Sequence, residues 1–381
     1  MSAVSGPAYP AARIVAPKIH AHFARHLAET PHHASDVVLL PNADTIETLI
    51  EAAFWASLRR EENYVPRISL AFLSPEEAVH PLRLDRPLPL EPGALVRVSP
   101  AVDRAGIHLG VWQEGEQLCV WGTTRTIPTF CVVIEVAAPG LIVVKHHRGT
   151  ETGKFVNVAV LEGDQIKVVD ERASSLPDCP PLLTSLLGLD SPASWADSVN
   201  ILVQLAVSMR AHGRGGSLLV VRDATDGWRE SMSRPIPYAI VPPFTELAEL
   251  NRERPEPGRR RVWQEAVTRA VDATAGLTAV DGATILTAEY ELLAFGAKII
   301  RRRGAAPVEI VTVTEPIEGG VPVQVHPSAL GGTRHLSAAQ FVHDQRDAIA
   351  LIASQDGRFT VFAWSPCEGT VHAHRVETLL L

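Results

Sequence analysis

The chain has 381 residues, of which 46% are hydrophobic and 20% charged, so it is long enough for two or three domains and is not intrinsically disordered. Its formal net charge of -8 does not favour binding to nucleic acid or to an anionic membrane surface. No apolar run approaches the roughly 20 residues that span a bilayer, and no signal peptide is visible. The four cysteines are scattered, which suggests neither a zinc site nor a disulfide framework. We therefore expect a cytoplasmic protein.

The first part of the chain, residues 1–173, is predicted to form a strand-rich α+β domain. Short apolar runs alternate there with turn signals such as Glu114-Gly115 and Pro139-Gly140. This spacing is typical of antiparallel strands joined in a meander. Because no catalytic constellation accompanies the strands, we interpret the domain as a sensor, scaffold or interaction module. The expected strands cover residues 68–72, 95–98, 107–112, 118–121, 131–136, 141–144 and 155–160.

Two helices are expected before these strands. Residues 1–17 contain several prolines and predict an irregular arm, followed by a short helix over residues 20–27. A longer helix is expected to begin at Asp44-Thr45, one of which would be its N-cap. His22 and His26 have the i, i+4 spacing of metal ligands on a helix, and the alternative is a solvated polar face.

A breaker-rich segment over residues 174–194 predicts a linker to a second domain over residues 195–381. The second domain should open with a helix from Trp195 to Ala211, with Ser194 as its N-cap. Alternating helices and buried strands then predict an α/β unit with a mixed central sheet flanked by helices. The expected strands cover residues 218–221, 281–286, 291–295, 347–353 and 358–364, and a further helix covers residues 259–274.

The stretch Gly331-Gly332-Thr333 runs into a predicted helix and is the clearest candidate site. A glycine-rich turn at a helix N-terminus presents unpaired backbone N–H groups and the positive end of the helix dipole. Arg334 would add a forked donor that suits phosphate. The alternative is a simple loop in which Thr333 is the N-cap and Arg334 points into solvent.

Taken in order, the segments of residues 195–366 resemble the diadenylate cyclase domain, which is a nucleotidyltransferase. Residues 215–221 look like the first core strand of that family. Asp281-Gly282-Ala283 resembles its Asp-Gly-Ala motif, and residues 332–335 resemble most of its Gly-Thr-Arg-His-Arg motif. Residues 347–354 look like its strand that ends in Ser-Glu.

This resemblance implies that two ATP molecules, held face to face across a homo-oligomer, are condensed into cyclic di-AMP with release of pyrophosphate. Asp281 would ligate Mg²⁺ or Mn²⁺, and it would form the catalytic group together with Arg334 and His335. The residues expected to bind nucleotide are Gly282, Ala283, Ile299, Gly332, Thr333, Ser354 and Gln355.

The chain departs from the family pattern in two positions and by one insertion. Leu336 stands where the family has a second arginine, and Gln355 stands where it has a glutamate. The insertion covers residues 301–330, and its basic start, residues 301–303, could supply the missing cation. The sequence thus leaves three hypotheses: a diadenylate cyclase, a degenerate receptor for ATP or a cyclic dinucleotide, and an interaction protein without a nucleotide site.

Overall fold

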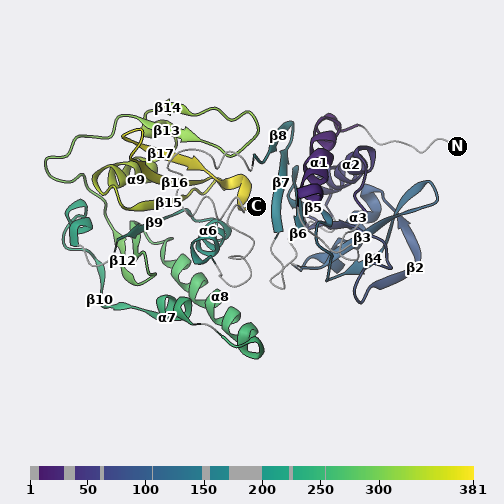
Figure 1. Ribbon diagram of the computed structural model, residues 1–381, viewed down its shortest axis with the longest axis horizontal. Helices are drawn as coiled ribbons and strands as arrows, with labels where there is room; N and C mark the ends of the chain where they lie inside the picture. The colour runs from purple at the N-terminus through teal and green to yellow at the C-terminus, as the bar shows by residue number, and fades with distance from the viewer. Residues whose placement is uncertain are drawn as a thin grey trace. The chain divides into compact units, whose positions relative to one another are not determined.

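The structure is a computed structural model that describes residues 8–29, 39–60, 64–104, 106–147, 155–170, 200–222, 226–253 and 255–381. The chain divides into two compact units, Met1–Val169 with Leu381 and Asp170–Leu380. Each unit contains helices and its own mixed sheet, so the protein is α+β and rich in strands (Figure 1). The linker predicted over residues 174–194 lies outside the described residues. Within the described ranges, no helix has the length and apolar character needed to cross a bilayer.

The described part of the N-terminal unit contains a sheet of eight strands in the order β2-β4-β3-β1-β5-β6-β7-β8. Strands β5 to β8 form the predicted meander, but β1 pairs with β3 in parallel, which makes the sheet mixed. The strands are β1 Ser69–Phe72, β2 Leu82–Pro89, β3 His108–Glu114, β4 Gln117–Thr124, β5 Val132–Ala138, β6 Leu141–His147, β7 Phe155–Glu162 and β8 Gln165–Val168. Six of these were predicted, whereas β2 and β8 were not.

The described part of the N-terminal unit also contains three α-helices, α1 Pro10–Glu29, α2 Ala43–Ser57 and α3 Pro92–Val98. The first two pack together on one face of the sheet and bury apolar side chains such as Phe23 and Ile50 against it. The side chain of Asn42 caps α2 by accepting from the backbone N–H of Thr45, so the predicted cap at Asp44-Thr45 is wrong by two to three residues.

Two other local predictions in this unit are wrong. Residues 10–17 are not irregular, because α1 continues through Pro17 and buries Ala12, Val15 and Ala16 at helical spacing. Residues 95–98 are not a strand but the end of α3, since a short apolar run has the same appearance in a buried helix and in a strand.

The histidine pair of α1 fits neither interpretation made from the sequence. The rings of His22 and His26 lie 4.6 Å apart, but His22 is buried instead of solvated. Across the described residues there is no group of three side chains that could hold a metal ion.

The C-terminal unit is built on a sheet in which nine described strands follow the order β10-β12-β11-β9-β15-β16-β17-β13-β14. Its central strand β9 is wholly buried, as predicted for a run of Leu and Val. The strands are β9 Gly216–Val221, β10 Tyr238–Phe244, β11 Ala283–Thr287, β12 Leu292–Ala297, β13 Val311–Thr314, β14 Val323–Val325, β15 Ile349–Ala353, β16 Phe359–Ser365 and β17 Thr370–Arg375.

Helices cover both faces of this second sheet. An apolar cluster joins α6 Ile201–Ala211, α7 Glu246–Arg252 and α8 Arg260–Leu277 to one face. A second cluster joins α9 Thr333–Asp344 to the opposite face. Helix α6 begins after Asn200, whose side chain accepts from the backbone N–H of Val203, whereas a start at Trp195 was predicted. The predicted cap, Ser194, is outside the described residues.

Candidate functional site

The register of the central strands brings the predicted motifs to one edge of the C-terminal sheet. β9 and β11 are parallel and both begin at this edge, directly after Gly215 and Gly282. β15 is antiparallel to β9, with Ala353 opposite Gly216, so Ser354 and Gln355 follow at the same edge. β12 ends there too, because Ala297 pairs with Ala283. We call this group of strand ends the motif edge.

The start of α9 reaches the motif edge through Arg334. A Cβ atom on Gly215 would lie 2.6 Å from Nη1 of Arg334 and 3.3 Å from Cγ of Gln355, so these two side chains both lie against that glycine. Gly215 has φ +69°, a backbone conformation that favours glycine. Because glycine has no side chain, the guanidinium can approach the backbone closely at this position. Gly332 is the N-cap of α9, whereas the alternative from the sequence had Thr333 in that place. The hydroxyl-bearing Thr333 is exposed.

Asp281 forms an ion pair at the motif edge that the sequence did not reveal. Nζ of Lys298 donates to Oδ2 of Asp281, and both side chains are largely exposed. The hydrogen bond and positive charge of Lys298, assisted by the charge of Arg334, hold the pKa of Asp281 below its usual value. Asp281 is therefore an ionised carboxylate at neutral pH, which is the form that a hard divalent cation binds.

His335 lies inside the protein and not at the surface of the motif edge. Its side chain is buried, and a Cβ atom on Gly331 would lie 2.6 Å from its Nδ1. Its ring meets Phe362 of β16 edge-on, with the ring centroids 6.1 Å apart. Burial lowers the pKa of His335 and keeps the ring neutral, so it does not offer a phosphate a positive charge. The observed contacts are those of a packing residue.

The other predicted nucleotide residues have distinct surroundings. Ala283 is buried in the apolar cluster beneath α9, and Ile299 is half-buried and bridges to Met232. Gly282 has φ +116°, and a Cβ atom there would lie 2.6 Å from the carbonyl oxygen of Gly296. The contact between Gly282 and Gly296 is thus one between two backbones. Gln355 is exposed and donates from Nε2 to the carbonyl oxygen of Arg214 at 3.3 Å.

The basic start of the insertion lies away from the motif edge. The backbone N–H of Arg302 donates to Oδ2 of Asp344 at 2.8 Å, and its Nε lies 2.7 Å from Oε2 of Glu230. Asp344 is the last residue of α9, while Thr333 is the first. A helix of 12 residues is about 18 Å long, so within one protomer Arg302 and Arg334 lie at opposite ends of α9. Leu336 itself is 38% exposed.

A comparison with known families bears on the N-terminal unit. Residues 35–125 match the model of a family described as a probable sensor domain, DACNV. The matched segment runs from the approach to α2 to the end of β4 and covers less than half of the chain. No curated protein matches the sequence. The match supports the interpretation of the N-terminal unit as a sensor and covers no residue of the C-terminal unit.

Proposed function

We propose that the C-terminal unit is a diadenylate cyclase, which condenses two ATP molecules into cyclic di-AMP, and that the N-terminal unit is its sensor domain. The observation that carries this proposal is the motif edge. Asp281, Arg334 and Gln355 come from separate motifs of the sequence, and the strand register and the start of α9 place them together. The charges fit a nucleoside triphosphate with its divalent cation, because the guanidinium and the glycine-rich helix start suit the phosphates and the ionised carboxylate suits the cation.

In this proposal each residue of the motif edge has a task in binding or orientation. Arg334 and the backbone N–H groups at the start of α9 bind the phosphates. Asp281 would hold Mg²⁺ or Mn²⁺ together with the substrate phosphates, and the ion would supply positive charge beside the reacting α-phosphate. Lys298 must then leave Asp281, and the exposure of both side chains leaves them free to separate.

The reaction needs two protomers. The 3′-hydroxyl oxygen of each ATP forms a bond to the α-phosphorus of the other ATP, and the bond from that phosphorus to the bridging oxygen breaks. Two pyrophosphates leave, and each attacking hydroxyl loses a proton. Because one motif edge holds one ATP, the two nucleotides have to be brought face to face by two copies of the chain, and catalysis is mainly positioning and charge neutralisation.

The second candidate function is a receptor that binds ATP or a cyclic dinucleotide without turnover. Three observations favour it: Leu336 and Gln355 replace residues of the cyclase pattern, and Asp281 is already paired with Lys298. Both candidates predict nucleotide binding, and only the cyclase predicts a product.

The deciding experiment is incubation of the full chain with labelled ATP and either Mg²⁺ or Mn²⁺, followed by product chromatography. We expect cyclic di-AMP and two equivalents of pyrophosphate, with a rate per protomer that falls on dilution below the concentration at which copies associate. Arg269→Ala, which removes an exposed arginine from α8, is the matched control and should leave the product unchanged. Tight ATP binding without product would establish the receptor, and absence of both would reject the two candidates together.

A further inference from the structure

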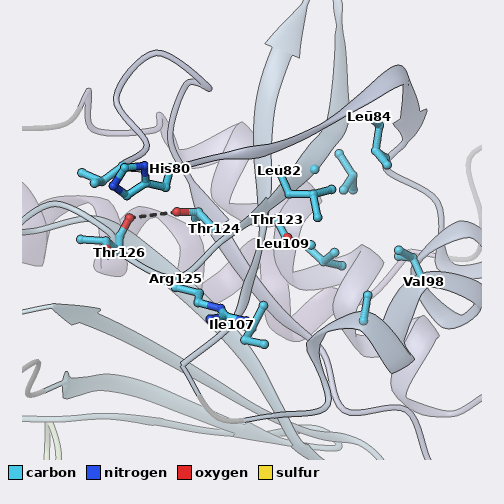
Figure 2. A pocket seen from close by; sticks show the side chains of 14 residues that line it. His80, Leu82, Leu84, Val98, Ile107, Leu109, Thr123, Thr124, Arg125 and Thr126 are labelled. Carbon is cyan, nitrogen blue, oxygen red and sulfur yellow. Dashed lines mark hydrogen bonds between the residues drawn. The ribbon is translucent and has the colours of Figure 1, made fainter.

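The N-terminal unit contains a cavity of about 570 Å³ that has no part in the proposed cyclase chemistry (Figure 2). Its walls come from β2, β3, β4, the end of α3 and the segments that precede β2, lead from α3 to β3 and follow β4. All but one of the lining residues fall within the segment that matches the sensor family, and Thr126 lies one residue beyond it. Pockets of roughly 300–1,000 Å³ are the size that holds small organic ligands.

The cavity exists because β2 bows away from β4. Arg83 pairs with Gly122 and Leu88 with Val120, so β2 carries three more residues than β4 between these two pairs. Leu84 lies in this bulge and lines the cavity. Gly122 lies at one end of the bulge with φ +155°. A Cβ atom there would lie 2.9 Å from the carbonyl carbon of Leu82, so the absence of a side chain lets the two strands approach at this point. A β-bulge beside a binding site is a common way to open a sheet.

Most of the cavity surface is apolar. Leu109 and Val120 form a fully buried part of it, while Val79 and Leu82 at its rim are 51% and 60% exposed. Exposed apolar side chains around a concave surface are stabilised when a ligand removes them from water. The remaining apolar lining residues are Leu84, Val98, Ala101 and Ile107.

The polar groups lie on both sides of the segment where the chain leaves β4. Figure 2 shows His80 close to Thr126, and Arg125 on the segment between Thr124 and Thr126. The hydroxyl of Thr124 donates to the carbonyl oxygen of Thr126 at 3.0 Å, which braces this segment. Within the described part of the chain, the side chains of Arg125 and His80 make no hydrogen bond or ion pair, so their donors are free for a ligand.

We infer that this cavity binds a small amphipathic carboxylate, whose apolar body fills the cavity and whose carboxylate pairs with Arg125. A guanidinium matches a carboxylate with two parallel hydrogen bonds, which an alcohol or an ammonium group cannot accept. The inference goes beyond the proposed function by giving the sensor a ligand class. It stands apart from cyclase activity, because it is tested by binding alone.

The test is titration calorimetry of the full chain with three probes that share one apolar chain: octanoate, octan-1-ol and octyltrimethylammonium. We expect octanoate to bind at least about tenfold more tightly than octanol, and the cationic probe to bind least. Arg125→Gln should remove the preference for octanoate. Arg83→Gln is the matched control, because it removes the same charge from a neighbouring residue that does not line the cavity, and it should keep the preference.

A second variant tests the place of binding without disturbing the core. Ala101 is exposed at the rim, so Ala101→Trp should fill the cavity and weaken octanoate and octanol alike, with an unchanged melting temperature. Equal affinity for octanoate and octanol, preference for the cation, absence of binding by any probe, or octanoate binding that survives both Arg125→Gln and Ala101→Trp would each overturn the inference.

Discussion

Gly282 offers the sharpest test of how the motif edge is built. Resemblance to the cyclase family gives this glycine the task of leaving room for a nucleotide, whereas the structure shows it against the backbone of Gly296. Gly282→Ala would place a side chain at φ +116°, with backbone strain of about 1–3 kcal/mol. The new Cβ atom would also lie 2.6 Å from the carbonyl oxygen of Gly296, and such overpacking costs about 1–3 kcal/mol.

The two costs act on the same residue, so Gly282→Ala should destabilise the C-terminal unit by about 2–6 kcal/mol. In a domain of this size each kcal/mol shifts the melting temperature by about 2–4 °C, so we expect a fall of at least about 4 °C in differential scanning calorimetry. Gly276→Ala is the matched control, because that glycine lies in α8 with no atom within 4 Å of the added Cβ. It should stabilise the helix by up to about 1 kcal/mol.

One result would refute this reasoning. If Gly282→Ala melts at the wild-type temperature but no longer binds ATP, the glycine serves the nucleotide and not the contact with Gly296. If it melts lower and ATP binding falls only in proportion to the unfolded fraction, the backbone contact is the reason for glycine at this position.

Three further predictions concern charge. Asp281→Asn should abolish cyclic di-AMP formation and leave the circular dichroism spectrum unchanged, and undiminished product would remove Asp281 from the mechanism. Arg334→Ala should weaken ATP binding by roughly 1.5–3 kcal/mol in calorimetry, while Arg269→Ala should not. His108 is buried against Ser69, and burial, followed by the charge of Lys145, lowers its pKa to about 4. As the pH falls below about 6.5, His108 therefore becomes protonated in the unfolded chain before it does so in the folded chain. The free energy of unfolding should thus fall by about 2 kcal/mol between pH 7 and pH 5 on account of His108 alone. His108→Gln should reduce this fall in the free energy of unfolding, measured by urea titration at a series of pH values. A variant with the same dependence of the unfolding free energy on pH as the wild type would contradict the burial argument.

The sequence predicts those parts of the fold in which periodicity and hydrophobicity agree. The wholly buried β9, with its Leu and Val run, and the strands of the N-terminal meander are cases of this kind. It fails where burial overrides local signals. In α1 the buried side chains of Val15, Ile19 and Phe23 outweigh Pro17, although a proline in a helix interior removes one backbone hydrogen bond. Strand β2 was missed because its side chains are mostly exposed and the alternation of Leu82 and Leu84 with polar residues ends at Arg86-Pro87.

The candidate site is predictable to a similar extent. Glycine-rich turns and an Asp-Gly step mark the ends of strands and the start of a helix, and strand register then brings them together. Lys298 was missed because a single basic residue at the end of a strand forms no pattern in the sequence. The burial of His335 was also invisible, since a histidine in the first turn of a helix can face the core or the solvent equally well.

The ion pair between Asp281 and Lys298 gives the departure at Leu336 a physical context. The family pattern has two arginines on the phosphate loop, and this chain keeps Arg334 alone. The basic start of the insertion is held at the far end of α9 by Asp344 and Glu230, so within one protomer it does not replace the lost charge. Lys298 is a further cation at the motif edge, and its charge already acts on Asp281. In the proposed cyclase, a triphosphate would attract both Arg334 and Lys298, and the movement of Lys298 would free the carboxylate for the divalent cation. In that proposal, Lys298 would provide the positive charge that the family takes from a second arginine.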